Sequence, residues 1–574
     1  MNNPELLATD TGDTDRVGVD RPGLSDAIAN DPDSGDFGIN SALAGPSPVD
    51  SLADPLVDPL GPDTIEWDLV LPAEDAVRLS RLKLLAPLRD GRARSRAVRY
   101  VWHDGPDAAL AKAGLALVER RHHWRLEQMR PSTAARPDAT WPPGMAPKLL
   151  GEAAAMKDLA EAVQLREPVY AADMGTLPDP CIPWAAFEGR ALGVPLRYAH
   201  EAVELTVLQG AIRTVMREHF TARVRICGPA AAATAVALLL AGEIGLAVPR
   251  SSLADEALSA ARGAIPRPRA LGAPKLSRDF TVAEAFDRIV AHLTDVILHW
   301  APLAAGGEDG PEPVHQMRVA TRRLRSAISV FSRAIDTPSI AQADAGLKAL
   351  AKALGPARDW DVFNSGIGAD IGLAFDADRE DGQAVAKLLA ATERQRVAGY
   401  EALRRAVAAP EFRQLGIRLA ALAATRPWEA EIDDDARTAL ALPLEDFAAL
   451  VLHRRWKRMF AEGVDIEHLE TETLHVIRLR AKRLRYAAEF FAALFPPKAT
   501  KRFIHRLSEL QEKLGTLNDG AVAAGLLQSL HGGGNERAFA IGAVRGFVAA
   551  IGGASRAGIA DAWKKFRKQD PFWT

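Results

Sequence analysis

An eleven-residue pattern that occurs twice restricts the fold of this chain more than any other feature. The first copy, residues 315–325, reads HQMRVATRRLR, and the second, residues 475–485, reads HVIRLRAKRLR. In an α-helix, positions 0, 3, 7 and 10 of each copy (His, Arg, Arg or Lys, and Arg) fall within roughly 80° of one side, over about 15 Å of rise. Each copy therefore predicts a helix with a cationic stripe.

The opposite side of both predicted helices is apolar, which predicts that this side packs into a hydrophobic core. Its members are Met317, Ala320, Leu324, Ile328 and Phe331 in the first copy and Ile477, Ala481, Leu484, Ala488 and Phe491 in the second.

The repeat continues beyond the two helices. Leu347, Leu350, Leu354, Gly355, Asp359 and Val362 recur at the same offset as Leu507, Leu510, Leu514, Gly515, Asp519 and Val522. A constant offset over nearly fifty residues predicts a duplicated helical unit. Two such units related by a pseudo-twofold axis are expected to turn their basic faces toward a common groove or pore.

These motifs resemble the CHAD domain family. The resembling sequences are HxxRVxxRRLR followed by LxxLxxxLGxxRD, and HxxRxxxKRLRY followed by LxxLxxxLGxxND. The resemblance covers about residues 280–574, including Ala562-Trp563 and Pro571-Phe572-Trp573 near the end. It implies an all-α domain of two duplicated helical bundles, at about 280–440 and 441–574, that binds inorganic polyphosphate.

The candidate polyphosphate-binding residues are the two stripes and the cations that follow them. They are His315, Arg318, Arg322, Arg323, Arg325, Lys352, Arg358, His475, Arg478, Lys482, Arg483, Arg485 and Lys513. Arg323 and Arg483 point about 80° away from the histidines. For these two, ion pairs with Asp359 and Asp519 are the first expectation and phosphate contact is the second.

An arginine stripe is most often a solvated helix face, and three features favour binding instead. Neither 315–325 nor 475–485 contains opposite-sign partners at i,i+4, which would be typical of a salt-bridged surface helix. The duplication places equivalent cations in both halves, and arginine can bind phosphate bidentately. A metal site at the two histidines is the weaker alternative, because no Cys, Asp or Glu accompanies them at ligand spacing.

The first 280 residues divide into three parts. Residues 1–63 hold thirteen acidic residues and two arginines, which predicts a disordered acidic tail, either solubilising or competing in cis for the basic groove. Residues 64–262 predict an α+β domain with a mostly antiparallel sheet, plausibly closed into a barrel, with strand-like runs at 65–71, 97–102, 115–120, 202–208 and 221–226. Residues 263–279, rich in Pro and Gly, predict a linker.

The α+β part resembles the CYTH fold, a triphosphate-tunnel barrel. The resemblance rests on the opening strand, the turn at 102–107 (WHDGPD), and the segments 112–117 and 203–210. The family's first strand reads ExExK, whereas this chain has Glu66, Asp68 and Val70 there. A strand that normally alternates glutamates carries Arg223 and Arg225 instead.

Phosphoryl transfer needs metal-binding carboxylates and cations on the phosphate, so these departures predict a degenerate barrel with no catalytic residues. The alternative is an Mg²⁺-dependent triphosphate or polyphosphate hydrolase with Glu66 and Asp68 as metal ligands. Arg120, Arg121, Arg223 and Arg225 could hold an anion, but solvated surface arginines are the first expectation.

Composition adds a few limits. Cys181 and Cys227 are far apart and indicate neither a disulfide framework nor a zinc site, which suits a reduced cytoplasm. No signal peptide is expected, and the apolar run 230–241 is too short to span a membrane and predicts a buried helix. The expected function is non-catalytic polyphosphate binding in the cytoplasm, and the CHAD resemblance implies targeting to polyphosphate granules. Nucleic-acid binding is a further alternative, which the scarcity of aromatic residues along the stripes disfavours.

Overall fold

The computed structural model describes most of the chain between residues 64 and 574. Residues outside the description are 1–63, 80, 122, 130–141, 167–176, 264–273, 307–309, 333, 377, 461–465, 467–468 and 531–533, and at 471–472, 516–521 and 551–557 only the backbone is described. The predicted acidic tail and most of the predicted linker therefore lie outside the described residues.

An eight-stranded antiparallel sheet forms the N-terminal part, in the order β1-β8-β7-β6-β2-β3-β4-β5. The strands are β1 (Thr64–Val70), β2 (Arg94–Asp104), β3 (Leu115–Arg120), β4 (His123–Gln128), β5 (Lys148–Ala153), β6 (Ile182–Tyr198), β7 (Glu201–Arg213) and β8 (Glu218–Pro229). The outer edge of β1 bonds to the segment that leads into β5: Asp68 N donates to Gly144 O (2.7 Å), and Ala146 N donates to Glu66 O (2.9 Å). The sheet is thus curled, with its two ends meeting at this point.

All five predicted strand runs are confirmed, and β4, β5 and β6 are additional. Strand β6 was not predicted, because its sequence contains Pro183, Pro195 and two glycines. One of them, Gly189, faces Gly210 of β7, and a Cβ at Gly189 would lie 2.2 Å from the Gln209 carbonyl oxygen. Glycine is required there because the two backbones approach too closely for any side chain.

Strand alternation gives the β1–β8 end of the sheet one apolar face and one charged face. Trp67 and Leu69 of β1 pack with Val224 and Ile226 of β8 beneath α5 (Ala230–Glu243), the helix predicted from the alanine-rich run. The residues between them on β1, Glu66 and Asp68, point to the other face. Helix α6 (Leu253–Ala261) joins a second apolar cluster with β2, β6 and β7.

The remaining helices of the sheet region are short. They are α1 (Ala73–Leu79), α2 (Ala109–Lys112) and α3 (Leu159–Arg166). The carboxylate of Asp104 explains the turn at 102–107, because it accepts backbone N–H groups from Gly105 (2.7 Å), Leu110 (2.9 Å) and Ala111 (2.9 Å). These bonds satisfy amide groups at the start of α2.

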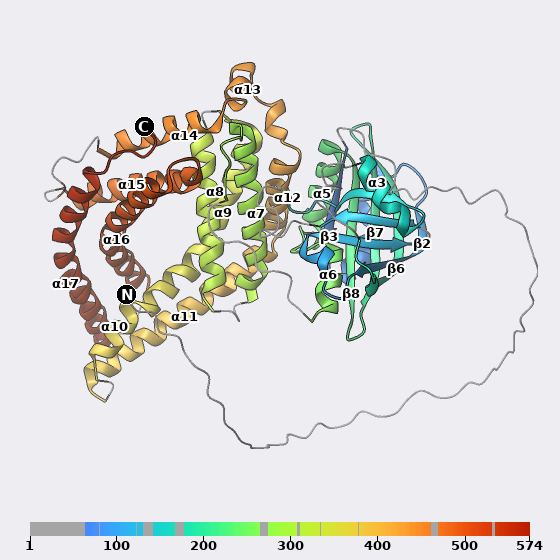
Figure 1. Cartoon of the computed structure of the whole chain (residues 1–574). Coiled ribbons are helices and arrows are strands. Elements are labelled where there is room, and N and C mark those ends of the chain that lie inside the picture. Colours follow the sequence, from blue (N-terminus) through green and yellow to red (C-terminus); the bar gives the residue numbers. More distant parts are fainter. Residues whose placement is uncertain are drawn as a thin grey trace, which may run out of the picture. The chain divides into compact units, whose positions relative to one another are not determined.

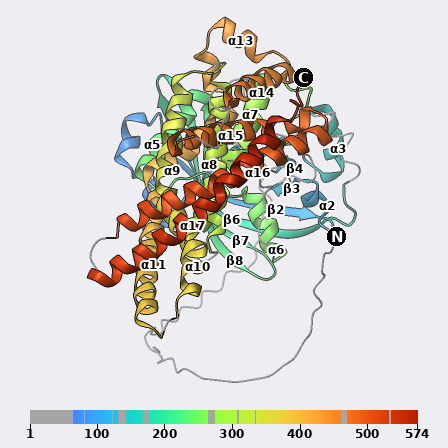
Figure 2. The same cartoon turned by 90° about the vertical axis from the view of Figure 1, so that its left-hand side faces the viewer.

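From residue 282 onward the described elements are helical (Figures 1 and 2). The helices are α7 (Val282–Gly306), α8 (Glu312–Phe331), α9 (Pro338–Ser365), α10 (Ile367–Ala374), α11 (Glu380–Ala408), α12 (Pro410–Ala424), α13 (Asp434–Leu440), α14 (Leu444–Phe460), α15 (Thr471–Phe491), α16 (Pro497–Gln528) and α17 (Gly534–Arg567). The first motif lies on α8 and continues on α9, and the second lies on α15 and continues on α16. Helix α17 runs beside both α16 and α11.

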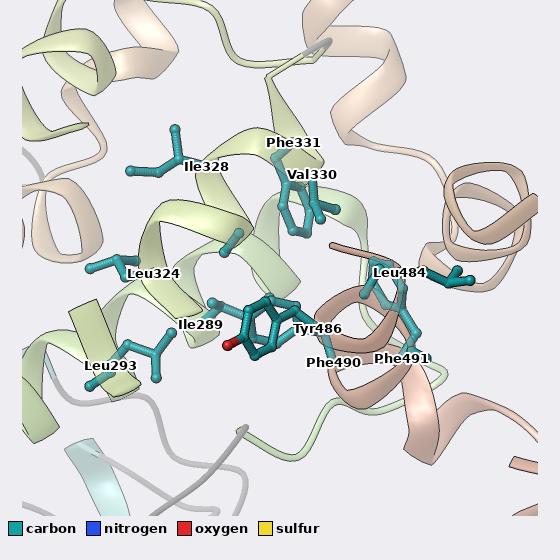
Figure 3. Packing of buried hydrophobic residues seen from close by; sticks show 14 of the residues in the cluster. Ile289, Leu293, Leu324, Ile328, Val330, Phe331, Leu484, Tyr486, Phe490 and Phe491 are labelled. Carbon is teal, nitrogen blue, oxygen red and sulfur yellow. The ribbon is translucent and has the colours of Figure 1, made fainter. Parts of the chain in front are cut away.

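The apolar sides of both motif helices enter one hydrophobic cluster, as predicted. Leu324 and Phe331 of α8 and Leu484 and Phe491 of α15 belong to this cluster, and all four are fully buried (Figure 3). The ring centroids of Phe331 and Phe491 lie 6.4 Å apart. The other predicted core positions of the two motifs are also buried in this cluster, as are the closing residues Trp563 and Trp573. The core residues of α8 and α15 therefore fix both cationic stripes relative to each other.

Helix α7 is the one described helix that is long and apolar enough, by length and composition, to cross a membrane. However, 56% of its most apolar stretch is buried inside the protein, and Phe286, Ile289 and Leu293 belong to the helical core. More than half of the most apolar stretch of α7 therefore packs inside the protein.

Candidate anion-binding site

The two motif copies meet at one cavity of about 390 Å³. Of the basic and histidine residues in its lining, three come from α8, one from α9 and two from α15. The basic and histidine residues that line the cavity are His315, Arg318, Arg322, Arg358, Arg478 and Lys482. The expectation that basic faces from both copies turn toward a common space agrees with this placement.

Helical periodicity explains why these residues converge. Arg318 and Arg322 are four residues apart on α8, and Arg478 and Lys482 occupy the same repeat positions on α15, so each pair forms a short cationic strip. Both helices are anchored by their apolar sides in the shared core. The cavity-facing sides are therefore presented on rigid elements.

Of the described residues that line the cavity, only Asp359 is acidic, against five arginines and lysines. Its carboxylate lies 3.2 Å from the Arg318 guanidinium, and both side chains are about one-third exposed. Arg318 also lies 3.5 Å from the carbonyl oxygen of Gly355. An anion that enters the cavity therefore competes with Asp359 for Arg318.

The predicted pairing of Arg323 with Asp359 is wrong. Arg323 instead contacts Glu489 of α15 at 2.9 Å, because its side of α8 faces α15, whereas Asp359 lies on α9 beside the cavity. Likewise, Arg325 contacts Asp344 of α9 at 2.8 Å. The motif sequence could not predict the ion pairs of Arg323 and Arg325, because their acidic partners lie on other helices. The side chain of Asp519 lies outside the described residues.

The cavity lining does not include every candidate. Besides Arg323 and Arg325, the residues outside it are Lys352, His475, Arg483, Arg485 and Lys513. Arg485 is ion-paired with Glu489 (3.3 Å) and lies 5.7 Å from the Tyr486 ring centroid. His475, Lys352, Arg483 and Lys513 are exposed.

Burial first, and neighbouring cations second, lower the pKa values of two residues that line the cavity. Partial burial, followed by the charges of Arg358, Arg322 and Arg318, lowers the pKa of His315 below its usual range. Partial desolvation and the neighbouring cations Arg318, Arg485 and Arg323 similarly lower the pKa of Arg322, whose guanidinium lies 5.5 Å from the Tyr486 ring centroid. Like charges held this close favour a bound anion.

Apolar side chains also line the cavity, which the motif residues did not predict. Val362, Phe363 and Ile367 line it from α9 and α10, and Val522 and Leu526 line it from α16. Val362 and Val522 are equivalent positions of the repeat and are 41% and 40% exposed. The recurrence of this valine was visible in the sequence, but its placement at the site required the fold. Apolar walls strengthen ion pairing by limiting water.

The charged face of the sheet is largely neutralised by its own residues. Arg120 contacts Glu127 (2.7 Å), and Arg223 contacts Glu256 (2.6 Å). The prediction of solvated surface arginines is wrong for Arg120, Arg223 and Arg225, which are 7%, 2% and 6% exposed, because alternation along the strands directs them into the curled sheet. Arg121 is exposed, as predicted.

Glu66 and Asp68, the alternative metal ligands, lie on this charged face. Glu66 contacts Arg225 at 3.4 Å, and burial, despite Arg225, raises the pKa of its carboxyl. Asp68 is 2% exposed and lies directly opposite Arg225 in the strand register. Among the described residues, no group of three or more His, Cys, Asp and Glu side chains is placed to hold a metal ion.

The helices from residue 282 onward form an all-α region in which both motif copies contribute cations to one cavity. A model of the CHAD domain family matches residues 288–528, from within α7 to the end of α16. The chain therefore contains a CHAD domain at these residues, and this family is associated with polyphosphate binding.

Two curated relatives are "Uncharacterized protein MT2285" of Mycobacterium tuberculosis (strain CDC 1551 / Oshkosh) and "Uncharacterized protein Rv2226" of Mycobacterium tuberculosis (strain ATCC 25618 / H37Rv). Each is 28% identical over 207 residues, which cover 36% of this chain and 39% of the relative. The chain thus spans about two-fifths of the length of these relatives.

Two solved structures are also similar. The CHAD domain from the plant Ricinus communis is 28% identical with a TM-score of 0.42, and the match covers 51% of this chain and 96% of that one. PptA from Streptomyces chartreusis is 15% identical with a TM-score of 0.39, covering 50% of this chain and 100% of that one.

Proposed function

We propose that the helical domain binds inorganic polyphosphate without chemical change, in the cavity between α8, α9, α15 and α16. One observation carries the proposal: equivalent cationic positions from both motif copies line a single cavity. Arg318 and Arg322 correspond to Arg478 and Lys482 at the repeat offset. On this proposal, the two halves of the helical domain are duplicated units that bind one polyphosphate chain from two sides.

The chemistry of the lining suits successive phosphate groups. Arginine offers a planar fork of donors and lysine a compact charge, so both bind phosphate oxygens strongly. Among the described residues, the cavity lining holds five cations and one carboxylate, so the lining itself is predominantly positive. Because each neutralised phosphate releases counterions, affinity falls steeply as salt rises.

Nucleic acid is the less favoured ligand. Single-stranded nucleic acids bind through stacking of bases on exposed aromatic rings. Phe363, the one aromatic side chain among the described residues that line the cavity, is 3% exposed, and the neighbouring Tyr486 is 4% exposed. Both rings are therefore too buried to stack on a base.

The proposal assigns the curled sheet to a degenerate CYTH-like domain, at about residues 64–262, without a catalytic role. Support comes from the pairing of Glu66 with Arg225 and of Arg120 with Glu127. An Mg²⁺-dependent hydrolase would need these carboxylates and cations for the metal and the phosphates. A binding protein of this kind would act in the cytoplasm and localise to polyphosphate granules.

Titration with long-chain polyphosphate tests the proposal. The double variant Arg322→Gln/Arg478→Gln removes one cation of each motif copy from the cavity, whereas Arg394→Gln/Arg405→Gln removes two exposed arginines of α11 that do not line it. We expect the cavity variant to lose affinity and the α11 variant to keep it. Equal affinities for the two variants would refute the cavity as the binding site.

A further inference from the structure

A second group of arginines lies where α14 meets α15. Two bonds between the helices hold it together: Arg455 Nη1 donates to the Arg483 carbonyl oxygen (2.8 Å), and Arg480 Nη1 donates to the Arg458 carbonyl oxygen (3.0 Å). We call Arg455, Arg458, Arg480 and Arg483 the α14–α15 arginine patch. None of the four lines the cavity.

The patch concentrates like charge. Burial, followed by the charges of Arg483 and Arg458, lowers the pKa of Arg455 to about 10. Among the described residues, Arg455, Arg458 and Arg483 form no ion pair with a carboxylate, in contrast to Arg318, Arg323 and Arg325 of α8. A bound anion would relieve the like charges of Arg455, Arg458 and Arg483.

The patch and the cavity lie on different sides of α15. At 100° per residue, Arg480 and Arg483 leave the helix about 100–160° away from Lys482. His475 and Leu479 lie between these directions and are exposed. Because a helix with its side chains is about 10–12 Å across, a phosphate chain that leaves the cavity can pass over His475 and reach the patch.

We propose that the α14–α15 arginine patch is a second contact for the same polyphosphate chain, used only by chains long enough to extend beyond the cavity. The inference depends on the proposed function, since it extends the ligand from that site. It assigns Arg483, which the cavity leaves out, a role in phosphate binding. It also makes affinity depend on chain length, because a second linked contact raises the local concentration of ligand.

The test compares tripolyphosphate with long-chain polyphosphate. The patch variant is Arg458→Gln/Arg483→Gln, since both side chains are exposed. Its matched control is Arg394→Gln/Arg405→Gln on α11, which also removes two positive charges but lies outside the patch. Affinity for each phosphate is measured against salt concentration, after circular dichroism has shown that the variants are folded.

For long-chain polyphosphate, we expect the patch variant to bind more weakly than the control, with a log–log salt slope shallower by about 1.4, or about 0.7 per cation. For tripolyphosphate, the two variants should bind equally. Equal long-chain binding by both variants would overturn the second contact. So would an equal loss of affinity for both phosphates, which would indicate one undivided site.

Failure of the proposed function has a different signature. In that case Arg322→Gln/Arg478→Gln leaves the binding of both phosphates unchanged. The outcome for the cavity variant therefore tests the first site, and the difference between the two phosphates tests the second.

Discussion

Asp359 is the position at which a single substitution is expected to strengthen binding. It is acidic, it lines the cavity, and its carboxylate lies 3.2 Å from Arg318. Substitution Asp359→Asn keeps the size of the side chain and removes its charge. Arg318 then no longer has to leave a carboxylate when it binds a phosphate.

The expected gain in affinity follows from the solvent exposure of the Arg318–Asp359 ion pair. Both side chains are about one-third exposed, so breaking the ion pair costs about 0.2–1 kcal/mol. Removing repulsion between the carboxylate and the ligand adds to this gain. A total of about 1 kcal/mol corresponds to an affinity increase of about fivefold, with a salt slope steeper by about 0.7 because one more cation is available.

Asp344→Asn is the matched control. Asp344 also lies on α9, pairs with an arginine of α8 (Arg325, 2.8 Å) and is about one-third exposed, but it does not line the cavity. Polyphosphate titrations at several salt concentrations measure both variants. Equal gains would show that bulk charge, not the cavity, controls affinity. Weaker binding by Asp359→Asn would show that Asp359 orients Arg318 for the ligand, contrary to our reasoning.

Three further predictions concern pH, the free protein and the core. The pKa of His315 is lowered in the free protein, and a bound anion raises it, so polyphosphate binding takes up a proton. Affinity for polyphosphate should therefore rise as pH falls through and below about 6.5. In titrations at several pH values, His315→Gln should flatten this dependence. Arg322→Gln removes a cation repelled by Arg318, Arg485 and Arg323, so it should weaken binding yet leave the unliganded protein equally or more stable to urea; a marked loss of stability would contradict this account of the repulsion. Phe491→Ala empties a fully buried position beside Phe331 and Phe447 and should lower the free energy of unfolding by about 3–5 kcal/mol, whereas the exposed Phe539→Ala should cost much less.

The sequence predicted the helical half well because its signal is periodic. The apolar positions of both motifs, such as Leu324 and Leu484, recur at helical spacing and are buried. The same periodicity placed Arg318, Arg322, Arg478 and Lys482 on one side of each helix, and these four line the cavity. Local patterning was sufficient for them because the side of a helix that a residue occupies depends only on spacing.

Periodicity within one helix could not predict contacts between helices that are distant in the sequence. The ion pairs of Arg323 with Glu489 and of Arg325 with Asp344 join separate helices. They depend on how the helices cross, which no spacing within one motif specifies. In the sheet, β6 was missed because Pro183 and Pro195 interrupt its pattern, although antiparallel pairing tolerates both.

The most direct test is calorimetric titration of the whole protein with long-chain polyphosphate, with and without Mg²⁺, combined with an assay for released phosphate. Our account predicts binding that weakens steeply with salt, that is reduced in Arg322→Gln/Arg478→Gln, and that releases no phosphate. Binding that is insensitive to salt and to both substitutions would contradict the cavity. Mg²⁺-dependent release of phosphate, abolished by Glu66→Gln, would show that the sheet is catalytic.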